Sequence, residues 1–410
     1  MRWTVSAALA LCVALAVPAG AQETGAQEID AGRALFLGRA TQTDDPALAR
    51  RLARLPCKSC HGGDGQGADE GRAPPIDGPS LSRATPDRPA YDAALFHRAV
   101  TAGQSAGGRA LSQLMPRYPM TAPEATALFA YLAALPAEQR QGVTPGRVTF
   151  GVAAPPGGGY RQTLQAALEA RLGGAMVHGR TVAFVPVDPG NAATGRQVLA
   201  VLALPAGAVP DFAAEGIPAL FPLGSLPGDE DPGTVRGFLP SAVGTRAALA
   251  ARLASDARGP VAIWPEDMAG GLRAALSASG PPAPSAKDPA REIVVLDGTE
   301  LDGALKTAPG ARLWIGWEAI RQAGHLPADR EVIAINDVPA LIGPRGDSPL
   351  AAHARLSGAV LAEVLKAAGR DLTRARLMAA FPAAWLDGLD LDYTAHPLTG
   401  TARVDFLPLR

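Results

Sequence analysis

The stretch "LPCKSCHGGDGQG", residues 55–67, sets two cysteines two residues apart and places a histidine directly after the second. Cys57, Cys60 and His61 have the spacing of a disulfide, half of a zinc site, a redox-active thiol pair, or an attachment point for a prosthetic group. The cysteine content and the surroundings of the motif distinguish these uses. The chain has three cysteines in all, and the third is Cys12.

The first 21 residues have the pattern of a secretory signal peptide. Arg2 supplies the positive start, the apolar run over residues 5–17 is too short to span a bilayer, and residues 19–21 are the small residues that precede a cleavage site. An uncleaved anchor helix is the alternative. We expect the mature chain to begin near Gln22 in the periplasm, which leaves one pair of cysteines, too few for a disulfide scaffold.

The pattern Cys-x-x-Cys-His is the attachment signal of c-type haem. The two thiols form thioethers with the vinyl groups on one edge of the porphyrin, and the next residue presents an imidazole nitrogen to the iron. A zinc site would need further cysteines. A thioredoxin-like pair usually follows a strand, whereas residues 44–58 read as helix and loop, and a disulfide between Cys57 and Cys60 would close a small, strained ring. We therefore predict one covalent haem c, with its iron bound by His61.

Haem iron has a second axial position, which a thioether or a second imidazole commonly fills. Downstream of the motif the chain offers Met115 and Met120, with His97 a little earlier. We expect Met115 to be the ligand, because the proline that follows it keeps its loop extended. Met120 is the alternative, although it directly precedes a capping box of Thr121 and Glu124, where an apolar residue is expected to pack in any case. His97 lies on a polar helix face and is expected to be solvated.

Residues 28–140 resemble class I cytochrome c, the small monohaem family. "IDAGRALFLGRA" is similar to its N-terminal helix, "CKSCHGGDGQG" to its haem-binding start, and "MPRYPMTAPEATALFAYLAAL" to its ligand loop and C-terminal helix. "APPIDGPSL" supplies Pro74 or Pro75, whose carbonyl would orient the proximal imidazole. The resemblance implies an all-α domain with His61 and Met115 as the axial pair. The segment over residues 41–55 departs from the family and is expected to lengthen a loop.

The pattern changes after this region. A polar stretch with Pro and Gly predicts a linker at residues 139–147. From Val148 onward, short runs rich in valine and isoleucine alternate with longer Ala/Leu segments, which predicts parallel sheets flanked by helices, in two small lobes or one barrel. The predicted strands are residues 147–154, 180–188, 197–205, 217–224, 260–267, 292–298, 311–317 and 331–337, and the predicted helices are residues 160–173, 245–257, 268–280 and 357–369.

Residues 148–410 resemble the type 1 periplasmic binding proteins of the leucine/isoleucine/valine-binding kind. "LSGAVLAEVLKAAGRDLTRARLMAAF" and "HPLTGTARVDFLPL" are similar to that family's last helices and closing strand, and "GFLPSAVGTRAALAARLASDARGPVAIWPEDMAGGLRAAL" to its entry into the second lobe. The resemblance implies a two-lobed α/β domain with a solute cleft. "AGAVPDFAAEG" stands where the family has a serine-bearing loop that grips a carboxylate, so we expect the ligand to have changed or been lost. The cleft candidates lie near strand ends and are Gly158, Tyr160, Trp264, Glu266 and Trp317.

The sequence thus predicts a multidomain chain: signal peptide 1–21, all-α cytochrome c domain 22–138, linker 139–147 and α/β binding-protein-like domain 148–410. A net charge of −1 without a basic block argues against nucleic acid as a partner. With both axial positions of the iron filled, outer-sphere electron transfer is expected rather than enzymatic catalysis. A membrane span is not expected after signal cleavage.

Three functions from different classes remain open at this point, and one of them, a haem enzyme such as a peroxidase, would require an open axial position on the iron that Met115 is expected to block. The first is periplasmic electron transfer to and from redox partner proteins; the second domain's resemblance suggests a quinoprotein dehydrogenase as donor, or a terminal oxidase chain as partner. The alternative is a solute-binding or sensor protein for an amino acid or small organic ligand, in which the haem is accessory.

Overall fold

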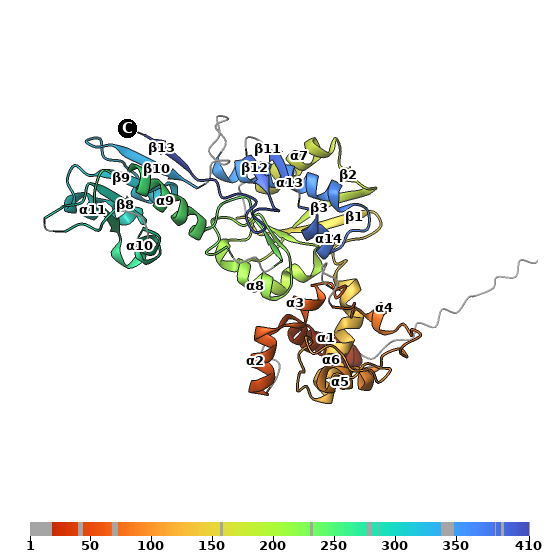
Figure 1. Cartoon of the computed structure of the whole chain (residues 1–410). Helices are drawn as coiled ribbons and strands as arrows, with labels where there is room; N and C mark the ends of the chain where they lie inside the picture. Colours follow the sequence, from red (N-terminus) through yellow and green to blue (C-terminus); the bar gives the residue numbers. More distant parts are fainter. Residues whose placement is uncertain are drawn as a thin grey trace, which may run out of the picture. The chain divides into compact units, whose positions relative to one another are not determined.

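A computed structural model describes residues 19–39, 44–67, 73–155, 159–229, 233–276, 281–285, 287–337, 348–381, 383–386 and 389–409 (Figure 1). The chain divides into two compact units, Met1–Glu138 and Gln139–Arg410. The predicted signal peptide lies outside the described residues except for its last three positions. Among the described residues, no helix combines the length and the apolar character needed to cross a bilayer.

The regular elements among the described residues of the first unit are all helices. Its elements are α1 (Ala19–Leu37), α2 (Pro46–Arg54), α3 (Cys57–His61), α4 (Gly78–Leu81), α5 (Ala93–Ala102) and α6 (Ala122–Glu138). Helices α1 and α6 cross at Gly32, where a Cβ would lie 2.0 Å from the carbonyl oxygen of Ala127. The rings of Phe36 and Tyr131 pack beside this crossing, with centroids 5.5 Å apart. Glycine therefore allows the two helices to approach closely enough to form the core of the unit.

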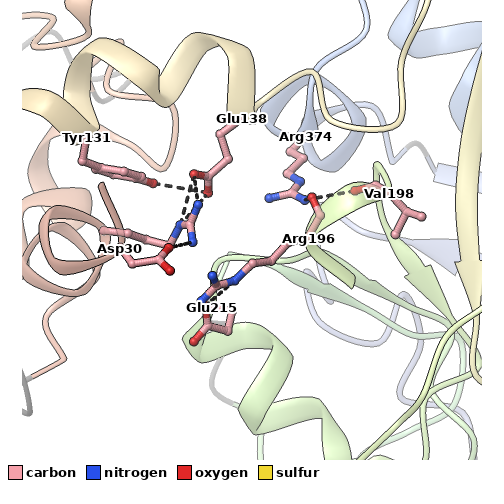
Figure 2. Close-up of polar contacts among 8 residues, drawn as sticks. Asp30, Tyr131, Glu138, Arg196, Val198, Glu215 and Arg374 are labelled. Atoms are coloured by element: carbon pink, nitrogen blue, oxygen red, sulfur yellow. Dashed lines mark hydrogen bonds and ion pairs between the residues drawn. The ribbon is translucent and has the colours of Figure 1, made fainter. Parts of the chain in front are cut away.

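An ion-pair cluster joins the same two helices. Arg33 of α1 is 9% exposed, and its guanidinium lies 2.6 Å from the carboxylate of Glu138 at the end of α6 and 2.7 Å from that of Asp30. Figure 2 shows Asp30, Tyr131 and Glu138 pointing toward one another. The cluster holds α1 against the last turn of α6, where a buried guanidinium needs carboxylate partners.

The segment over residues 41–55 does more than lengthen a loop. It contains α2, which Asp45 caps by accepting a hydrogen bond of 2.8 Å from the backbone N–H of Ala47. Leu48 and Leu52, four residues apart on one face of α2, are fully buried in the core of the unit. The prediction of helix and loop over residues 44–58 is therefore confirmed, and the segment adds a helix to the core rather than only a longer loop, because this spacing gives it an apolar face.

The second unit contains two open sheets rather than one barrel. The first runs in the order β2 (Met176–Val177), β3 (Arg180–Pro186), β1 (Arg147–Val152), β4 (Val201–Leu202), β5 (Ala219–Leu220), β6 (Val235–Arg236). The second runs in the order β13 (Asp405–Pro408), β10 (Val332–Asn336), β9 (Arg312–Gly316), β8 (Glu292–Val295), β7 (Val261–Trp264). All pairings are parallel except the edge pairs β2–β3 and β10–β13. Each of the eight predicted strands contains one of these strands, so the prediction of parallel sheets is right for their interiors.

Helices and short turns surround the two sheets. The α-helices of this unit are α7 (Tyr160–Leu172), α8 (Val209–Ala214), α9 (Ala242–Asp256), α10 (Gly270–Leu276), α11 (Leu301–Thr307), α12 (Trp317–Ala323), α13 (Pro349–Ala368) and α14 (Arg374–Ala379). The 3-10 turns are η2 (Ala192–Gln197), η3 (Ala206–Ala208), η4 (Glu266–Met268) and η5 (Gly298–Glu300), and a hairpin is formed by β11 (Ala383–Leu386) and β12 (Leu389–Asp392). Each of the four predicted helices of this region overlaps α7, α9, α10 or α13.

The chain passes between the two sheets three times, which produces two lobes. After β6 it enters α9, whose Leu249 and Leu253 share a core with β7 and β9 of the second sheet. It returns in α13, which packs on α7 of the first lobe so closely that a Cβ on Gly358 would lie 2.5 Å from the carbonyl oxygen of Leu164. It crosses again before β13, which pairs with β10. The α/β unit is therefore two-lobed, as the sequence predicts.

The segment expected to be a linker, residues 139–147, is attached to the second unit. The carbonyl of Gln139 accepts a hydrogen bond of 2.9 Å from the backbone N–H of Arg374, and Gly142 accepts one of 2.7 Å from Thr149. Arg374 itself is buried and donates to the carbonyl of Val198 at 3.0 Å, a contact drawn in Figure 2. These bonds fix the start of the second unit to its first sheet.

Candidate functional site

Helix α3 is one turn long and presents the three residues of the opening motif. Pro56 precedes it in extended conformation, which sets the chain direction into the turn. Cys57 is partly buried against the helical core, Cys60 is exposed, and His61 is buried. The two cysteines are not joined by a disulfide. The turn therefore places two thiols and an imidazole at the boundary between the core and the surface.

The imidazole of His61 is fixed by one hydrogen bond. Its Nδ1 lies 2.8 Å from the carbonyl oxygen of Pro74. A carbonyl can only accept, so Nδ1 carries the proton and Nε2 keeps its lone pair. Among the described residues, no hydrogen bond to this Nε2 is recorded. Burial lowers the pKa of His61, and the hydrogen bond to Pro74 opposes this effect. Burial has the larger effect, so it favours the neutral ring.

Glycines let the loop after α3 turn back so that Pro74 reaches this imidazole. Gly65 and Gly67 have φ values of 72° and 93°, which side chains rarely adopt. A Cβ on Gly67 would also lie 2.4 Å from the carbonyl oxygen of Ala73. The N–H of Gly67 donates to the carbonyl of His61 at 2.8 Å. The sequence left Pro74 and Pro75 as alternatives, and it is the carbonyl of Pro74 that contacts the imidazole.

The environment of Cys57 differs from that of a redox-active thiol. A thiol–disulfide pair needs a stabilised thiolate, and therefore a lowered pKa. Burial instead raises the pKa of Cys57 to about 12, and the nearby Cys60 raises it further against the backbone hydrogen bond that lowers it. Cys57 therefore lacks the stabilised thiolate that a redox-active thiol pair needs.

Met115 lies on a loop that is held next to α3. Its side chain is partly buried against the helical core that also contacts Cys57. The guanidinium of Arg117 donates to the backbone carbonyl of Met115 and, at 3.2 Å, to that of Leu111. Gly103 leaves room for this guanidinium, since a Cβ there would lie 1.9 Å from its Nε. Arg117 thus fixes the loop from inside, a role that its position beside Met115 in the sequence did not reveal.

Two further contacts tie this loop to the chain on the N-terminal side of Cys57. The hydroxyl of Tyr118 donates to the carbonyl of Leu55 at 2.7 Å, and Arg51 of α2 donates to the carbonyl of Arg117. Cys57 and the Met115 loop are therefore positioned by the same set of bonds. Tyr118 was not anticipated as a positioning residue, because an isolated tyrosine gives no sign of its partner.

Met120 and His97 have structural partners instead. Met120 is 4% exposed in the helical core, and Thr121 after it forms the predicted capping box with Glu124: the N–H of Thr121 donates to the Glu124 carboxylate at 2.7 Å. His97 is only half exposed, and its Nε2 bonds to the carbonyl of Met120 at 2.9 Å. The expectation of a solvated His97 is wrong, because this bond uses the ring to hold the end of the loop.

The structure does not bring the cleft candidates together. Tyr160 is buried in the first lobe, where its hydroxyl lies 2.7 Å from Nδ1 of His353 and 3.2 Å from Oγ of Ser357. Trp264 packs against a core of the second lobe, and the side chain of Glu266 is 85% exposed and pairs with Arg273. Gly158 and the side chain of Trp317 lie outside the described residues.

Comparisons with known proteins match one family to part of the first unit. Residues 47–136 match the family model described as cytochrome c. None of the curated proteins compared with the chain matches it.

Several solved structures similar to the chain are binding proteins. A substrate-binding protein of an ABC transporter from Desulfitobacterium hafniense, in complex with Leu, is 17% identical, covers 64% of this chain and 95% of its own, and has a TM-score of 0.45. A possible leucine/isoleucine/valine-binding protein from Rhodopirellula baltica is 14% identical, with 65% and 97% coverage and a TM-score of 0.45. A solute-binding protein from Rhodopseudomonas palustris, in complex with p-hydroxybenzoic acid, is 14% identical, with 63% and 90% coverage and a TM-score of 0.43.

Proposed function

We propose that this chain, whose residues 47–136 form a cytochrome c domain, is an exported electron-transfer protein carrying one covalent haem c. Cys57 and Cys60 would form the thioethers, and His61 and Met115 would be the axial ligands. One observation carries the proposal: the carbonyl of Pro74 fixes the proton of His61 on Nδ1, which leaves Nε2 as a neutral, oriented donor for iron.

The residues present fit a haem of this kind. When bound, the haem supplies an iron centre that gains or loses one electron. Pro74 holds the imidazole of His61, and Arg117 holds the backbone of Met115, so the chain would hold both ligand residues in place when the iron changes its charge. The buried core behind them excludes water. A fixed ligand set and a dry environment both lower the reorganisation that accompanies electron transfer.

The surface around α3 suggests what kind of partner docks there. Leu55 and Leu114, which flank the two halves of the site, are 46% and 80% exposed. Residues 46–61 and 103–120 contain no acidic residue, although the chain as a whole has 39 acidic and 38 basic residues. Their basic residues are Arg50, Arg51, Arg54, Lys58, Arg109 and Arg117. This charge favours a redox partner with an acidic face and an apolar centre.

We propose a periplasmic quinoprotein dehydrogenase as the electron donor, on the strength of the family resemblance of the second domain. Reduction by such an enzyme should slow as ionic strength rises, because salt screens the attraction between the basic face and the partner. Arg50→Glu combined with Arg54→Glu should slow it at low salt, whereas Arg83→Glu, outside both segments, should leave the rate close to wild type. Stopped-flow reduction of the purified full chain measures all three.

The ligand assignment is tested by visible and near-infrared spectra of the purified full chain. Sulfur-ligated ferric haem has a weak near-infrared band, which should be present in wild type and absent in Met115→Ala. Met120→Ala should keep the band but should lower the stability of the helical domain by about 2–5 kcal/mol, because it leaves a cavity in the core. If the band instead disappears in Met120→Ala and persists in Met115→Ala, the assignment of Met115 is wrong.

Solute binding or sensing with an accessory haem is the second candidate. It is favoured by the construction of the α/β unit from two sheets that the chain links three times, the arrangement expected of a domain with a solute site between lobes. Leucine and p-hydroxybenzoate are the probes, after the ligands of two similar structures. A rise in the melting temperature with either one would support this function. Unchanged melting together with rapid reduction by a dehydrogenase would favour the electron carrier.

A further inference from the structure

The second unit has a pocket that neither proposed function uses. Its volume is about 270 Å³, and it lies at the amino ends of β1 and β3, where the chain enters the first sheet. Its charged lining consists of Arg140, Arg180, Arg370 and Asp371. Any solute site of the predicted type would lie at the opposite, carboxyl ends of these strands. The pocket is therefore separate from the predicted cleft.

The carboxylate in the pocket is already shared by two guanidinium groups. Arg140 Nη2 lies 3.0 Å from one oxygen of Asp371, and Arg376 Nη1 lies 3.1 Å from the other. The hydrogen bond from Arg140 has the largest effect and lowers the pKa of Asp371; desolvation opposes it, and the charges of Arg376, Arg140 and Arg180 lower the pKa further. Asp371 therefore remains ionised and contributes a single negative charge.

The other two arginines bring positive charge that this carboxylate does not balance. Arg180 directs its Nε to the carbonyl of Thr144 at 2.8 Å and its Nη1 to the carbonyl of Arg370 at 2.7 Å, so it is held rigidly by neutral groups. The side chain of Arg370 is exposed, and among the described residues no carboxylate partner is recorded for it. The pocket is thus lined by three arginines, Arg140, Arg180 and Arg370, and one carboxylate, in a chain whose basic and acidic residues are almost equal in number.

We infer that this pocket binds a small, multiply charged oxyanion, of the phosphate or the di- and tricarboxylate class. Guanidinium groups pair with the oxygens of such anions through two parallel hydrogen bonds, and an anion here would relieve the repulsion among the arginines. Val143, Pro145 and Leu372 complete the lining with apolar surface, against which the carbon skeleton of a carboxylate ligand would fit.

The test is calorimetric titration of the full-length haem-loaded protein with inorganic phosphate and, separately, with citrate, each at ionic strength matched with chloride. We expect saturable binding of at least one of the two at one site per chain. Binding of phosphate alone assigns the phosphate class, and binding of citrate alone assigns the carboxylate class. Failure of both anions to saturate overturns the inference, and it does so without affecting the haem proposal, which is read from the spectrum.

Three variants locate the binding. Arg370→Gln, which removes a group with no recorded carboxylate partner among the described residues, should weaken binding about tenfold or more. Arg161→Gln, an exposed arginine of α7 outside the pocket, is the matched control and should bind like wild type. Asp371→Asn removes the competing carboxylate and should tighten binding. Equal weakening in Arg370→Gln and Arg161→Gln, or no tightening in Asp371→Asn, would show non-specific attraction and overturn the inference.

Discussion

His61 of the helical domain and His353 of the α/β domain look alike by every simple measure. They are 8% and 2% exposed, and one ring nitrogen of each meets a proline carbonyl: Nδ1 of His61 meets Pro74 and Nε2 of His353 meets Pro222. They differ at the other nitrogen. In His353 it lies 2.7 Å from the hydroxyl of Tyr160, whereas no hydrogen bond to Nε2 of His61 is recorded among the described residues. The two histidines therefore differ at the second ring nitrogen and not in burial, and this difference supports the proposal that His61 is the iron ligand.

The two regions also differ in whether their polar groups have hydrogen-bond partners within the protein. Ser357 closes the network of His353, at 3.2 Å from the hydroxyl of Tyr160, and the ring of Phe238 packs over the imidazole with centroids 4.8 Å apart. This network joins α13 to the start of α7 and to the loop after β5, so it is structural. At α3, by contrast, two thiols and one imidazole nitrogen are left available to a ligand.

Replacing each histidine with alanine is the strongest test of this comparison. His61→Ala should abolish the spectrum of six-coordinate haem and leave the unfolding of the α/β domain unchanged. His353→Ala should leave the haem spectrum unchanged and destabilise the α/β domain by about 3 kcal/mol or more, because it creates a cavity and removes a partner of the buried Tyr160 hydroxyl. Tryptophan fluorescence reports this unfolding, since every tryptophan after residue 21 lies in the second unit. A changed haem spectrum in His353→Ala would break the comparison.

A second closed network in the α/β domain should behave like that of His353. Glu292 is fully buried and accepts hydrogen bonds from Arg312 at 2.8 Å and from Trp314 Nε1 at 2.7 Å. Arg312→Met should cost about 3–5 kcal/mol in the free energy of unfolding, because it leaves a buried carboxylate without its cation. The double variant Glu292→Met with Arg312→Met should recover most of this loss. Urea unfolding followed by fluorescence measures both, and equal losses in the two variants would contradict the explanation.

Acid should affect the α/β domain through His353. Burial lowers the pKa of His353 from 6.5 to about 4, against a smaller opposing effect of its bond to Pro222. Between pH 6.5 and about pH 4, this histidine therefore binds a proton in the unfolded chain and stays neutral in the folded chain. The resulting stability is complete above pH 6.5 and should fall by about 3 kcal/mol as the pH decreases to about 4. The loss should be absent from the His353→Gln variant, measured by fluorescence over the same pH range. An identical pH profile in both proteins would exclude His353 as the cause.

The smallest expected effect concerns the end of the ligand loop. Thr121→Ala removes one half of the capping box with Glu124 and should destabilise the helical domain by about 0.5–2 kcal/mol. The near-infrared band should persist, because Arg117 and Tyr118 hold Met115 independently of the cap. Loss of the band in this variant would mean that the cap, and not Arg117, positions the loop.

The parts of the structure that follow from local patterns were predictable, and the rest depended on distant partners. The Cys-x-x-Cys-His spacing, the capping box and the strand-length apolar runs identified the helical domain and eight strands of the α/β domain. Tyr160 was placed in a cleft because it follows a strand, but α13, whose His353 is 193 residues away in the sequence, covers it. Whether the carbonyl of Pro74 or of Pro75 contacts His61 depends on the turns that the preceding glycines make. The sequence permits these turns but does not specify their geometry.

The central claim is most directly tested by the intact mass of the chain purified from the periplasm of a cell competent for haem maturation. The account predicts a polypeptide beginning near Gln22 with the mass of one haem added, and the bare polypeptide mass when Cys57 and Cys60 are both replaced by serine. A wild-type chain with the bare polypeptide mass would contradict the account.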